Sequence, residues 1–258
     1  INIPTNGLLV DRIPDYVERI AEHCRNSEVV INVSIDDIGE LNDEIRGVAG
    51  AYEKALATFS ALKAMDLDNL SVGIHTVISK YNVGRISEIY PVLVSMHPDS
   101  YITEIAEERV ELGTIGLDIA PEDDRYMVAA DYLIERLKSD WFSRLGKVTR
   151  AFRMEYYELV KRILKERRQV IPCYAGFASA HIAPDGNVWM CCIKAESIGD
   201  LKTVDYRFAD VWFGETAQRM RANIKAGRCH CPLANTAYTN ILHSGRSLSR
   251  VSRNLVGW

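Results

Sequence analysis

No hydrophobic run in this sequence approaches the roughly 18 residues that a helix needs to cross a membrane. The start of the chain also lacks the pattern of a secretory signal peptide. Charge of neither sign dominates, because the net charge is only −4, so there is no general attraction to nucleic acid. We therefore expect a globular protein that neither spans a membrane nor binds nucleic acid.

Cysteine is sparse, with six among 258 residues, which is too few for a secreted scaffold held by disulfides. Histidine, aspartate and glutamate form no constellation with the spacing of a hydrolytic site, which disfavours an ordinary α/β-barrel enzyme. No methionine precedes Met65, and residues 1–4 (INIP) have the composition of a strand. We expect the true beginning of the protein to lie upstream of this sequence.

Apolar, β-branched segments alternate with helical periodicities over residues 1–105. The expected strands are Ile1–Thr5, Val29–Ile35, Leu70–Ile78 and Tyr101–Ile105, and the expected helices are Asp11–Cys24, Gly50–Met65 and Val83–Met96. This alternation indicates right-handed βα units around a parallel sheet. The second strand is almost wholly apolar, as expected for a strand buried on both faces. Four strands are half of a closed barrel, so we predict an α/β fold with an open or partial barrel.

Residues 121 to about 169 have a wholly helical pattern. Within them, Arg144–Arg168 carries nine Lys or Arg residues against three Glu. A solvated helix face is the simplest interpretation of this charge run. The alternative is a binding site for an acidic peptide or a phosphate group.

Five of the six cysteines are concentrated in the last third of the chain. Twelve residues separate Cys173 from Gly186, and four separate Gly186 from Cys191. Cys229 and Cys231 follow later, with one residue between them. Four thiolates brought together by folding are the usual ligands of zinc or of an iron–sulfur cluster. The clustering favours metal binding in a reducing compartment, which we take to be the cytoplasm.

A β-hairpin is expected from Pro184, Asp185 and Gly186, which form a turn between apolar residues. This hairpin would place Cys173 and Cys191 at the ends of adjacent strands. The second cysteine pair follows an expected helix over Ala217–Ala226.

Three interpretations of the cysteines remain open at this point. A C-x-C pair is less typical of zinc than C-x2-C, which favours iron–sulfur over zinc, while plain buried thiols are the third possibility. Cys192 should point away from its neighbour Cys191 if the strand continues. Cys24 is expected in the core, because free cysteine packs as a small hydrophobe.

The spacing Cys173-x12-Gly186-x4-Cys191 resembles a half-motif of radical S-adenosylmethionine enzymes that carry an auxiliary-cluster domain of the SPASM or twitch type. A full SPASM domain has a further cysteine-rich run, whereas only Cys229 and Cys231 follow here. The chain is therefore similar to the shorter twitch version. The resemblance implies one auxiliary [4Fe–4S] cluster with Cys173, Cys191, Cys229 and Cys231 as ligands.

The front of the chain resembles the same family independently. Residues 5–7 (TNG) are similar to the family's TNG strand end, and residues 33–37 (VSIDD) with 42–47 (NDEIRG) are similar to its fourth-strand segment. The physical placement agrees, because the carboxyl ends of parallel strands form the crevice where α/β proteins bind ligands.

The resemblance implies a site for S-adenosylmethionine that includes Asn6, Ser34, Asp36 and Arg46. Ser34 and an acidic group such as Asp36 would face the ribose. Arg46 would hold the carboxylate, which its planar guanidinium matches in a bidentate way. The alternatives are a helix N-cap role for the serine or aspartates and a surface ion pair for Arg46. Asn82 also fits the family pattern, with a turn residue as its alternative.

The resemblance implies three regions: a partial radical S-adenosylmethionine (βα) barrel over 1–120, connecting helices over 121–170, and a small α+β auxiliary-cluster domain over 171–258. The family's CxxxCxxC loop, which binds the catalytic [4Fe–4S] cluster, is absent from the sequence. It would lie upstream, together with barrel units that are missing here. We expect this chain alone not to cleave S-adenosylmethionine.

In the intact enzyme, the resemblance implies that a 5′-deoxyadenosyl radical abstracts hydrogen from a peptide or small-molecule substrate. A reductant such as flavodoxin or ferredoxin would supply single electrons, and the auxiliary cluster would take part in electron transfer. Glu104, Glu107, Glu108 and Arg109 are candidates to face the substrate, with structural ion pairs as the alternative. The rival class is a zinc-stapled binding module without catalysis.

Overall fold

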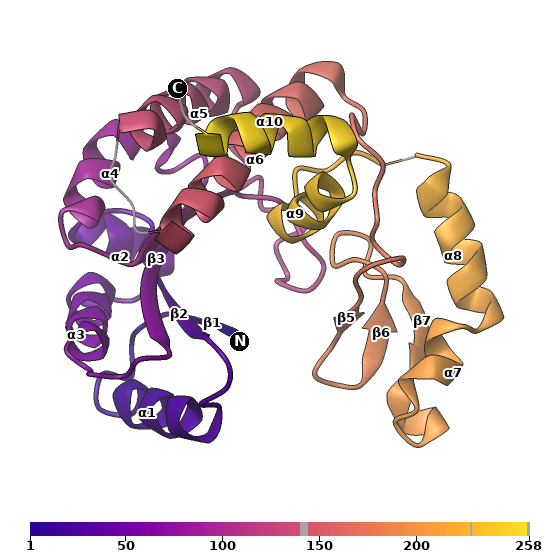
Figure 1. Ribbon diagram of the computed structural model, residues 1–258, viewed down its shortest axis with the longest axis horizontal. Helices are drawn as coiled ribbons and strands as arrows, with labels where there is room; N and C mark the ends of the chain where they lie inside the picture. Colours follow the sequence, from indigo (N-terminus) through magenta and orange to yellow (C-terminus); the bar gives the residue numbers. More distant parts are fainter. Residues whose placement is uncertain (140–143, 228, 257–258) are drawn as a thin grey trace. The chain divides into compact units, whose positions relative to one another are not determined.

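The computed structural model describes residues 1–139, 144–227 and 229–256. The chain divides into two compact units, Ile1–Ala106 and Glu107–Trp258 (Figure 1). The division lies before residue 120, where the sequence suggested the end of the first region, and the connecting helices fall in the second unit. Among the described helices, none is both long enough and apolar enough to cross a membrane.

The first unit is built on a four-stranded parallel sheet in the order β1-β2-β3-β4. Its strands are β1 (Asn2–Thr5), β2 (Val29–Ser34), β3 (Leu70–Ile78) and β4 (Ser100–Ile105). Its helices are α1 (Ile13–His23), α2 (Glu40–Arg46), α3 (Ala51–Lys63), the 3-10 helix η1 (Val83–Arg85) and α4 (Ile86–Val94). The predicted parallel sheet is confirmed. The short helix α2 was not anticipated, because seven residues are too few to display a period.

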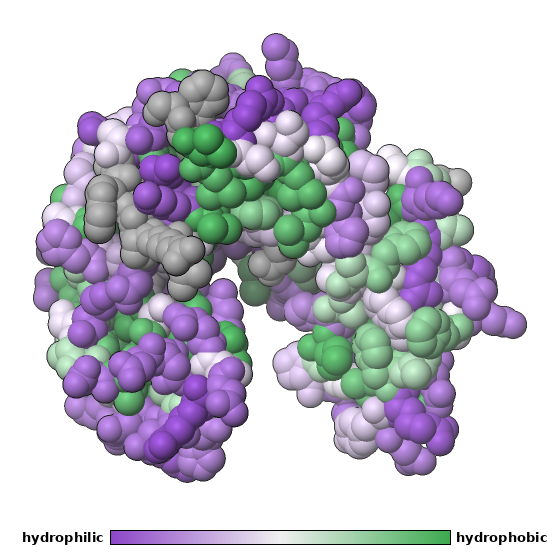
Figure 2. All heavy atoms as spheres, in the orientation of Figure 1, coloured by the Kyte–Doolittle hydropathy of each residue, from purple (hydrophilic) through white to green (hydrophobic). Residues whose placement is uncertain are grey.

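The two faces of this sheet differ in character. One face consists of buried apolar side chains that pack against the helices, and its members include Ile31, Val33, Val72 and Ile74. The other face presents Asn32, Ser34, His75, Ser100 and Glu104, of which only Asn32 is fully buried. The prediction that β2 is a buried parallel strand is confirmed for Val29 and for residues 31–33, while Val30 and Ser34 are half-buried. The helices keep their polar sides outward, and Figure 2 shows hydrophilic side chains over α1.

The second unit combines a helical layer with a small sheet. The helices of the layer are α5 (Asp123–Ser139), α6 (Arg144–Glu166), α9 (Ala234–Leu242) and α10 (Gly245–Val256). The antiparallel sheet consists of β5 (His181–Ile182), β6 (Asn187–Trp189) and β7 (Ser197–Asp200). The 3-10 helix η2 (Leu201–Val204), α7 (Phe208–Trp212) and α8 (Glu215–Lys225) complete the unit.

The predicted hairpin turn is confirmed at Gly186, which adopts a φ of 94° that favours glycine. The Asp185 carboxylate stabilises the turn by accepting the backbone N–H of Asn187 at 3.0 Å. The third strand β7 and the helix α7 were not anticipated. They enclose a small core around Val188, Met190 and Ile198.

The sequence suggested that the basic segment within α6 is a solvated helix face. The structure shows that part of it is buried. Arg153 and Glu155 are only 2% and 1% exposed. Glu155 pairs with Arg250 of α10, with Nη1 and Oε1 3.2 Å apart. Part of the charge run therefore serves packing within the helical layer.

Candidate metal centre

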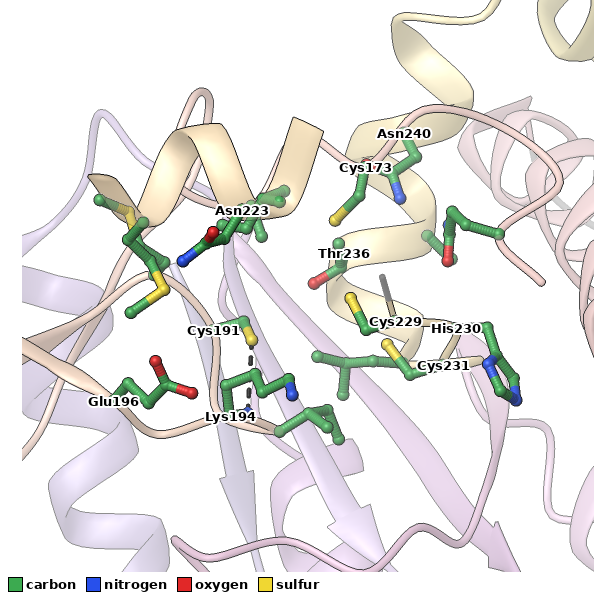
Figure 3. Close-up of a pocket in the computed structure, with 18 of the residues that line it drawn as sticks. Cys173, Cys191, Lys194, Glu196, Asn223, Cys229, His230, Cys231, Thr236 and Asn240 are labelled. Carbon is green, nitrogen blue, oxygen red and sulfur yellow. Dashed lines mark hydrogen bonds between the residues drawn. The ribbon is translucent and has the colours of Figure 1, made fainter. Parts of the chain in front are cut away.

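The four cysteines predicted as ligands line one pocket of the second unit: Cys173, Cys191, Cys229 and Cys231 (Figure 3). They come from three segments of the chain. Cys191 lies two residues after β6, and the C-x-C pair lies between α8 and α9. Cys173 lies in the irregular segment after α6, eight residues before β5. The expectation that it sits at a strand end was therefore wrong, although the pocket still includes it.

Backbone N–H groups point at three of these sulfur atoms. The N–H of Lys194 lies 3.5 Å from Cys191 Sγ, and that of Ile193 also donates to this thiol. Ala175 donates in the same way to Cys173, and Leu233 to Cys231. In each case a donor lies two residues after the cysteine. Such a donor favours the thiolate form that a metal requires.

Burial acts in the opposite direction. It raises the pKa of the Cys173, Cys191 and Cys231 thiols above the usual value, since a low-dielectric surrounding penalises the thiolate. Binding of a metal must therefore displace protons from these thiols.

The thiols surround a shared space and do not converge on a point. Among the described residues, no group of three or more His, Cys, Asp or Glu side chains is spaced to hold a single metal ion. Four thiolates on one zinc, with Zn–S bonds of about 2.3 Å, would lie about 4 Å apart or less. No such group is found in the described part of the chain.

The pocket is supported from the helical layer. The hydroxyl of Tyr156 on α6 donates to the carbonyl of Pro232, which follows directly after Cys231, at 3.1 Å. The backbone N–H of Tyr174, next to Cys173, donates to Asn240 Oδ1 of α9 at 2.7 Å. The loops that carry Cys173 and Cys231 are thus each held by a buried polar side chain of the helical layer. Neither Tyr156 nor Asn240 could be assigned to the site from the sequence, since neither belongs to the cysteine motif.

Cys192 lies outside this pocket, as expected for the neighbour of Cys191. It is 7% exposed, and burial together with the nearby Glu111 raises the pKa of its thiol to about 12. Cys24 is only half-buried at the end of α1, so the prediction of a core position was wrong.

The acidic and basic candidates for the substrate site make polar contacts within each unit. In the second unit, Arg109 lies between two carboxylates, 4.0 Å from Glu107 and 3.4 Å from Glu111. Glu108 accepts backbone N–H groups of its own loop. In the first unit, Glu104 Oε1 lies 3.7 Å from His75 Nε2. The structure thus gives each of the four predicted residues a polar contact within its own unit.

A second, smaller pocket lies at the carboxyl ends of β1 and β2 in the first unit. Its lining includes three of the residues that the sequence assigned to S-adenosylmethionine, Asn6, Ser34 and Arg46, together with Asn42. Asn42 was not among the predicted site residues, although it stands in the same NDEIRG segment. Its Oδ1 accepts the backbone N–H of Asp36 at 2.9 Å and so fixes the loop after β2.

Asp36 does not line this pocket. It is 6% exposed, pairs with Arg46 Nε at 2.9 Å, and accepts the backbone N–H of Val77. Burial raises the pKa of its carboxyl in spite of the neighbouring Arg46. The structure therefore places Asp36 behind the pocket, as the residue that orients Arg46.

Asn82 is a structural turn residue in this fold. It is fully buried, its Oδ1 accepts the backbone N–H of Ser79 at 2.7 Å, and its Nδ2 donates to the carbonyls of Asp36 and Val77. The alternative that the sequence left open is the one that the structure shows.

Comparison with known proteins agrees with the site. Residues 173–232 match the family model of SPASM, an iron–sulfur cluster-binding domain, and all four pocket cysteines lie within that range. The chain is 34% identical over 91 residues to an Fe-coproporphyrin III synthase of Methanosarcina barkeri (strain Fusaro / DSM 804). It is 39% identical over 87 residues to a pre-heme d1 synthase of Dinoroseobacter shibae (strain DSM 16493 / NCIMB 14021 / DFL 12).

These two matches cover 35% and 34% of this chain, and 21% and 20% of the relatives. The chain thus spans about a fifth of the length of the curated relatives it matches. Among solved structures, native anSMEcpe with bound AdoMet and Cp18Cys peptide matches with a TM-score of 0.54 and 14% identity, over 84% of this chain and 58% of that chain. A polyhistidine-tagged anSMEcpe with bound AdoMet gives 0.55 and 13%, over 84% and 55%.

The fold and the site thus define a protein that joins a parallel α/β unit to an iron–sulfur cluster-binding domain. The four thiols of its candidate metal centre all belong to that domain. Over residues 173–232 the chain matches the SPASM domain, and as a whole it is similar to the C-terminal part of radical S-adenosylmethionine proteins that carry such a domain.

Proposed function

We propose that the second unit holds one auxiliary [4Fe–4S] cluster, of the twitch type, in a radical S-adenosylmethionine oxidoreductase. The observation that carries the proposal is that Cys173, Cys191, Cys229 and Cys231 line one pocket inside the SPASM match. All four would bind the cluster through their thiolates.

The match of residues 173–232 to an iron–sulfur cluster-binding domain supports a cluster over zinc. The four cysteines that line one pocket supply the four thiolates that a [4Fe–4S] cluster requires. The N–H groups directed at Cys173, Cys191 and Cys231 would stabilise the negative charge of the ligands. When bound, the cluster supplies one-electron transfer to or from the substrate. The protein's own share is to hold the sulfur atoms and exclude water.

The first unit would supply part of the S-adenosylmethionine site. Asn6, Ser34 and Arg46 line its small pocket at the carboxyl ends of the strands, where α/β sheets bind ligands. Arg46 would hold the carboxylate of the cofactor, with Asp36 fixing the guanidinium from behind. The four parallel strands would form part of a barrel of the radical S-adenosylmethionine type.

The reaction proposed is abstraction of hydrogen from a peptide or small molecule by a 5′-deoxyadenosyl radical. It requires a CxxxCxxC loop with a second [4Fe–4S] cluster, which the 258-residue sequence does not contain. The peptide bound in one solved neighbour supports the peptide class, while the names of the curated relatives support a small-molecule class. The proposal includes a one-electron reductant such as flavodoxin or ferredoxin and a location in the reducing cytoplasm.

Anaerobic reconstitution of the chain with iron and sulfide tests the cluster. We expect a brown protein that gives an S = 1/2 electron paramagnetic resonance signal after reduction. A colourless protein that retains one tightly bound zinc through the same treatment would contradict the proposal and favour the zinc-stapled binding module.

A further inference from the structure

Asn240 is a buried amide next to the cysteine pocket. It belongs to α9, is 1% exposed, and lines the pocket together with the four cysteines. A buried amide is costly unless its oxygen and its nitrogen both have partners. Figure 3 shows the Asn240 side chain beside Cys173.

The orientation of the amide follows from its oxygen partner. The backbone N–H of Tyr174 is only a donor, so the atom of Asn240 that it meets at 2.7 Å must be the carbonyl oxygen Oδ1. The NH₂ group is then the end left for the Cys173 thiol, to which the Asn240 side chain is hydrogen-bonded. One amide thus contacts both the backbone after the first ligand and the ligand itself.

The same turn of α9 holds this segment at a second point. The Tyr174 ring stacks on His243, with ring centroids 4.3 Å apart and planes 25° apart. The His243 ring in turn lies 2.9 Å, at Nδ1, from the carbonyl of Thr239. Two side chains at the end of one helix therefore fix where Cys173 stands.

We propose that Asn240 is a positioning residue that sets the reduction potential of the auxiliary cluster. Its Oδ1 anchors the loop of Cys173, and its Nδ2 donates a hydrogen bond to the cysteine sulfur. This inference rests on the proposed function, because it requires that Cys173 binds the cluster.

The physical reason is the charge of the reduced state. Reduction adds one electron to the cluster, and part of the negative charge falls on the cysteine sulfurs. An N–H group directed at a sulfur stabilises the reduced state more than the oxidised state and raises the potential. Because the Asn240 amide is buried, its hydrogen bond acts in a low-dielectric surrounding, where it is stronger than in water.

The test is a redox titration of the reconstituted full chain, followed by electron paramagnetic resonance. Asn240→Asp retains an oxygen for the Tyr174 N–H but removes the donor and adds negative charge. We expect the equilibrium constant for reduction of the cluster in this variant to fall by about tenfold or more. This corresponds to a reduction potential lower by about 59 mV for one electron. Asn240→Leu removes the donor without adding charge and should lower the potential by less.

The matched control is Asn223→Asp. Asn223 lies on α8, lines the same pocket and is exposed, and among the described residues no hydrogen bond joins it to a cysteine. This variant should stay close to the unmodified chain. If both Asn240 variants keep the potential of the unmodified chain, the inference is overturned.

The remaining outcomes are also informative. Loss of iron from both Asn240 variants, with helical circular dichroism intact and Asn223→Asp fully loaded, supports the positioning role. Failure of the unmodified chain to bind any cluster contradicts the proposed function, and so differs from a failure of this inference.

Discussion

Two neighbouring cysteines show how strongly the role of a residue depends on its orientation. Cys191 faces the pocket of thiols, while Cys192 is buried on the other side among Glu111 and Arg109. Both thiols have a raised pKa, and burial is the main cause for each. What separates them is that Cys191 shares its pocket with three further thiols and Cys192 lies outside that pocket.

Replacing a pocket cysteine should remove the cluster. We expect Cys191→Ala or Cys229→Ala to lose most of the bound iron and sulfide. Each variant keeps only three of the four thiolate ligands, so one iron of the cluster has no cysteine ligand. Cys192→Ala is the adjacent control and should retain both. Chemical analysis of iron and sulfide after reconstitution measures the difference. Equal iron in all three variants would refute the ligand assignment.

The buried pair Glu155–Arg250 predicts a pH-dependent effect on stability. Burial raises the pKa of Glu155 above its usual value, and Ser247 and Arg250 oppose this rise. Because the folded pKa is raised, the contribution of this carboxyl to folding is full below its unfolded pKa and is lost as the pH rises. Removing Arg250 raises the folded pKa further, so the loss becomes larger at neutral pH.

We therefore expect Arg250→Ala to lower the free energy of unfolding near pH 7, because it leaves the buried Glu155 carboxylate without its ion-pair partner. The loss should be only about 1–2 kcal/mol, because Arg250 is partly exposed and solvent screens the pair. The loss should be smaller at a mildly acidic pH, where Glu155 is more fully protonated. Urea unfolding at both pH values measures it. The control is Arg253→Ala, since no ion pair with Glu155 is found for Arg253 in the described part of the chain. A loss of the same size at both pH values would count against this account.

At the scale of elements, buried polar side chains join strands to the loops that follow them. Asn42 of α2 holds the loop after β2, and Asn82 joins the ends of β2 and β3. Asp43 accepts the N–H groups of Gly50 and Tyr52, at 2.5 and 2.7 Å, and so fixes the start of α3. These hydrogen bonds fix the loops around the small pocket at the end of β2.

Asn82→Ala should destabilise the first unit. The change leaves the buried carbonyls of Asp36 and Val77 and the N–H of Ser79 without their partner, at a cost of about 3 kcal/mol. Asn223→Ala on the exposed face of α8 is the control and should change the stability little. Thermal unfolding followed by circular dichroism gives both values. An unchanged melting temperature for Asn82→Ala would contradict this prediction and would mean that water replaces the hydrogen bonds of the lost amide.

At the scale of the whole molecule, the sequence predicted the parallel sheet but not the whole of either unit. The strands were predictable because β-branched runs such as Val29–Ser34 and Leu70–Ile78 alternate with helical periods. The elements missed were mostly short, such as α2, α7 and β7, or lay after the last cysteine, as α9 and α10 do. The polar face of the sheet was missed because Asn32 and Ser34 are single polar residues in an apolar run.

The site was predictable to a similar degree. The cysteines stand at a spacing that the sequence displays, and the structure places all four around one pocket. Asn240 could not be found in this way, because it lies well after Cys231 in the sequence and meets the Cys173 segment only through folding. Polar residues that support a ligand carry no spacing of their own, so only the structure shows them.

Native mass spectrometry of the anaerobically reconstituted chain can distinguish a bound cluster from a bound zinc ion. We expect a mass increase equal to one [4Fe–4S] cluster, and no such increase for Cys191→Ala. A mass increase equal to a single zinc ion, or the same cluster mass in both proteins, would contradict it.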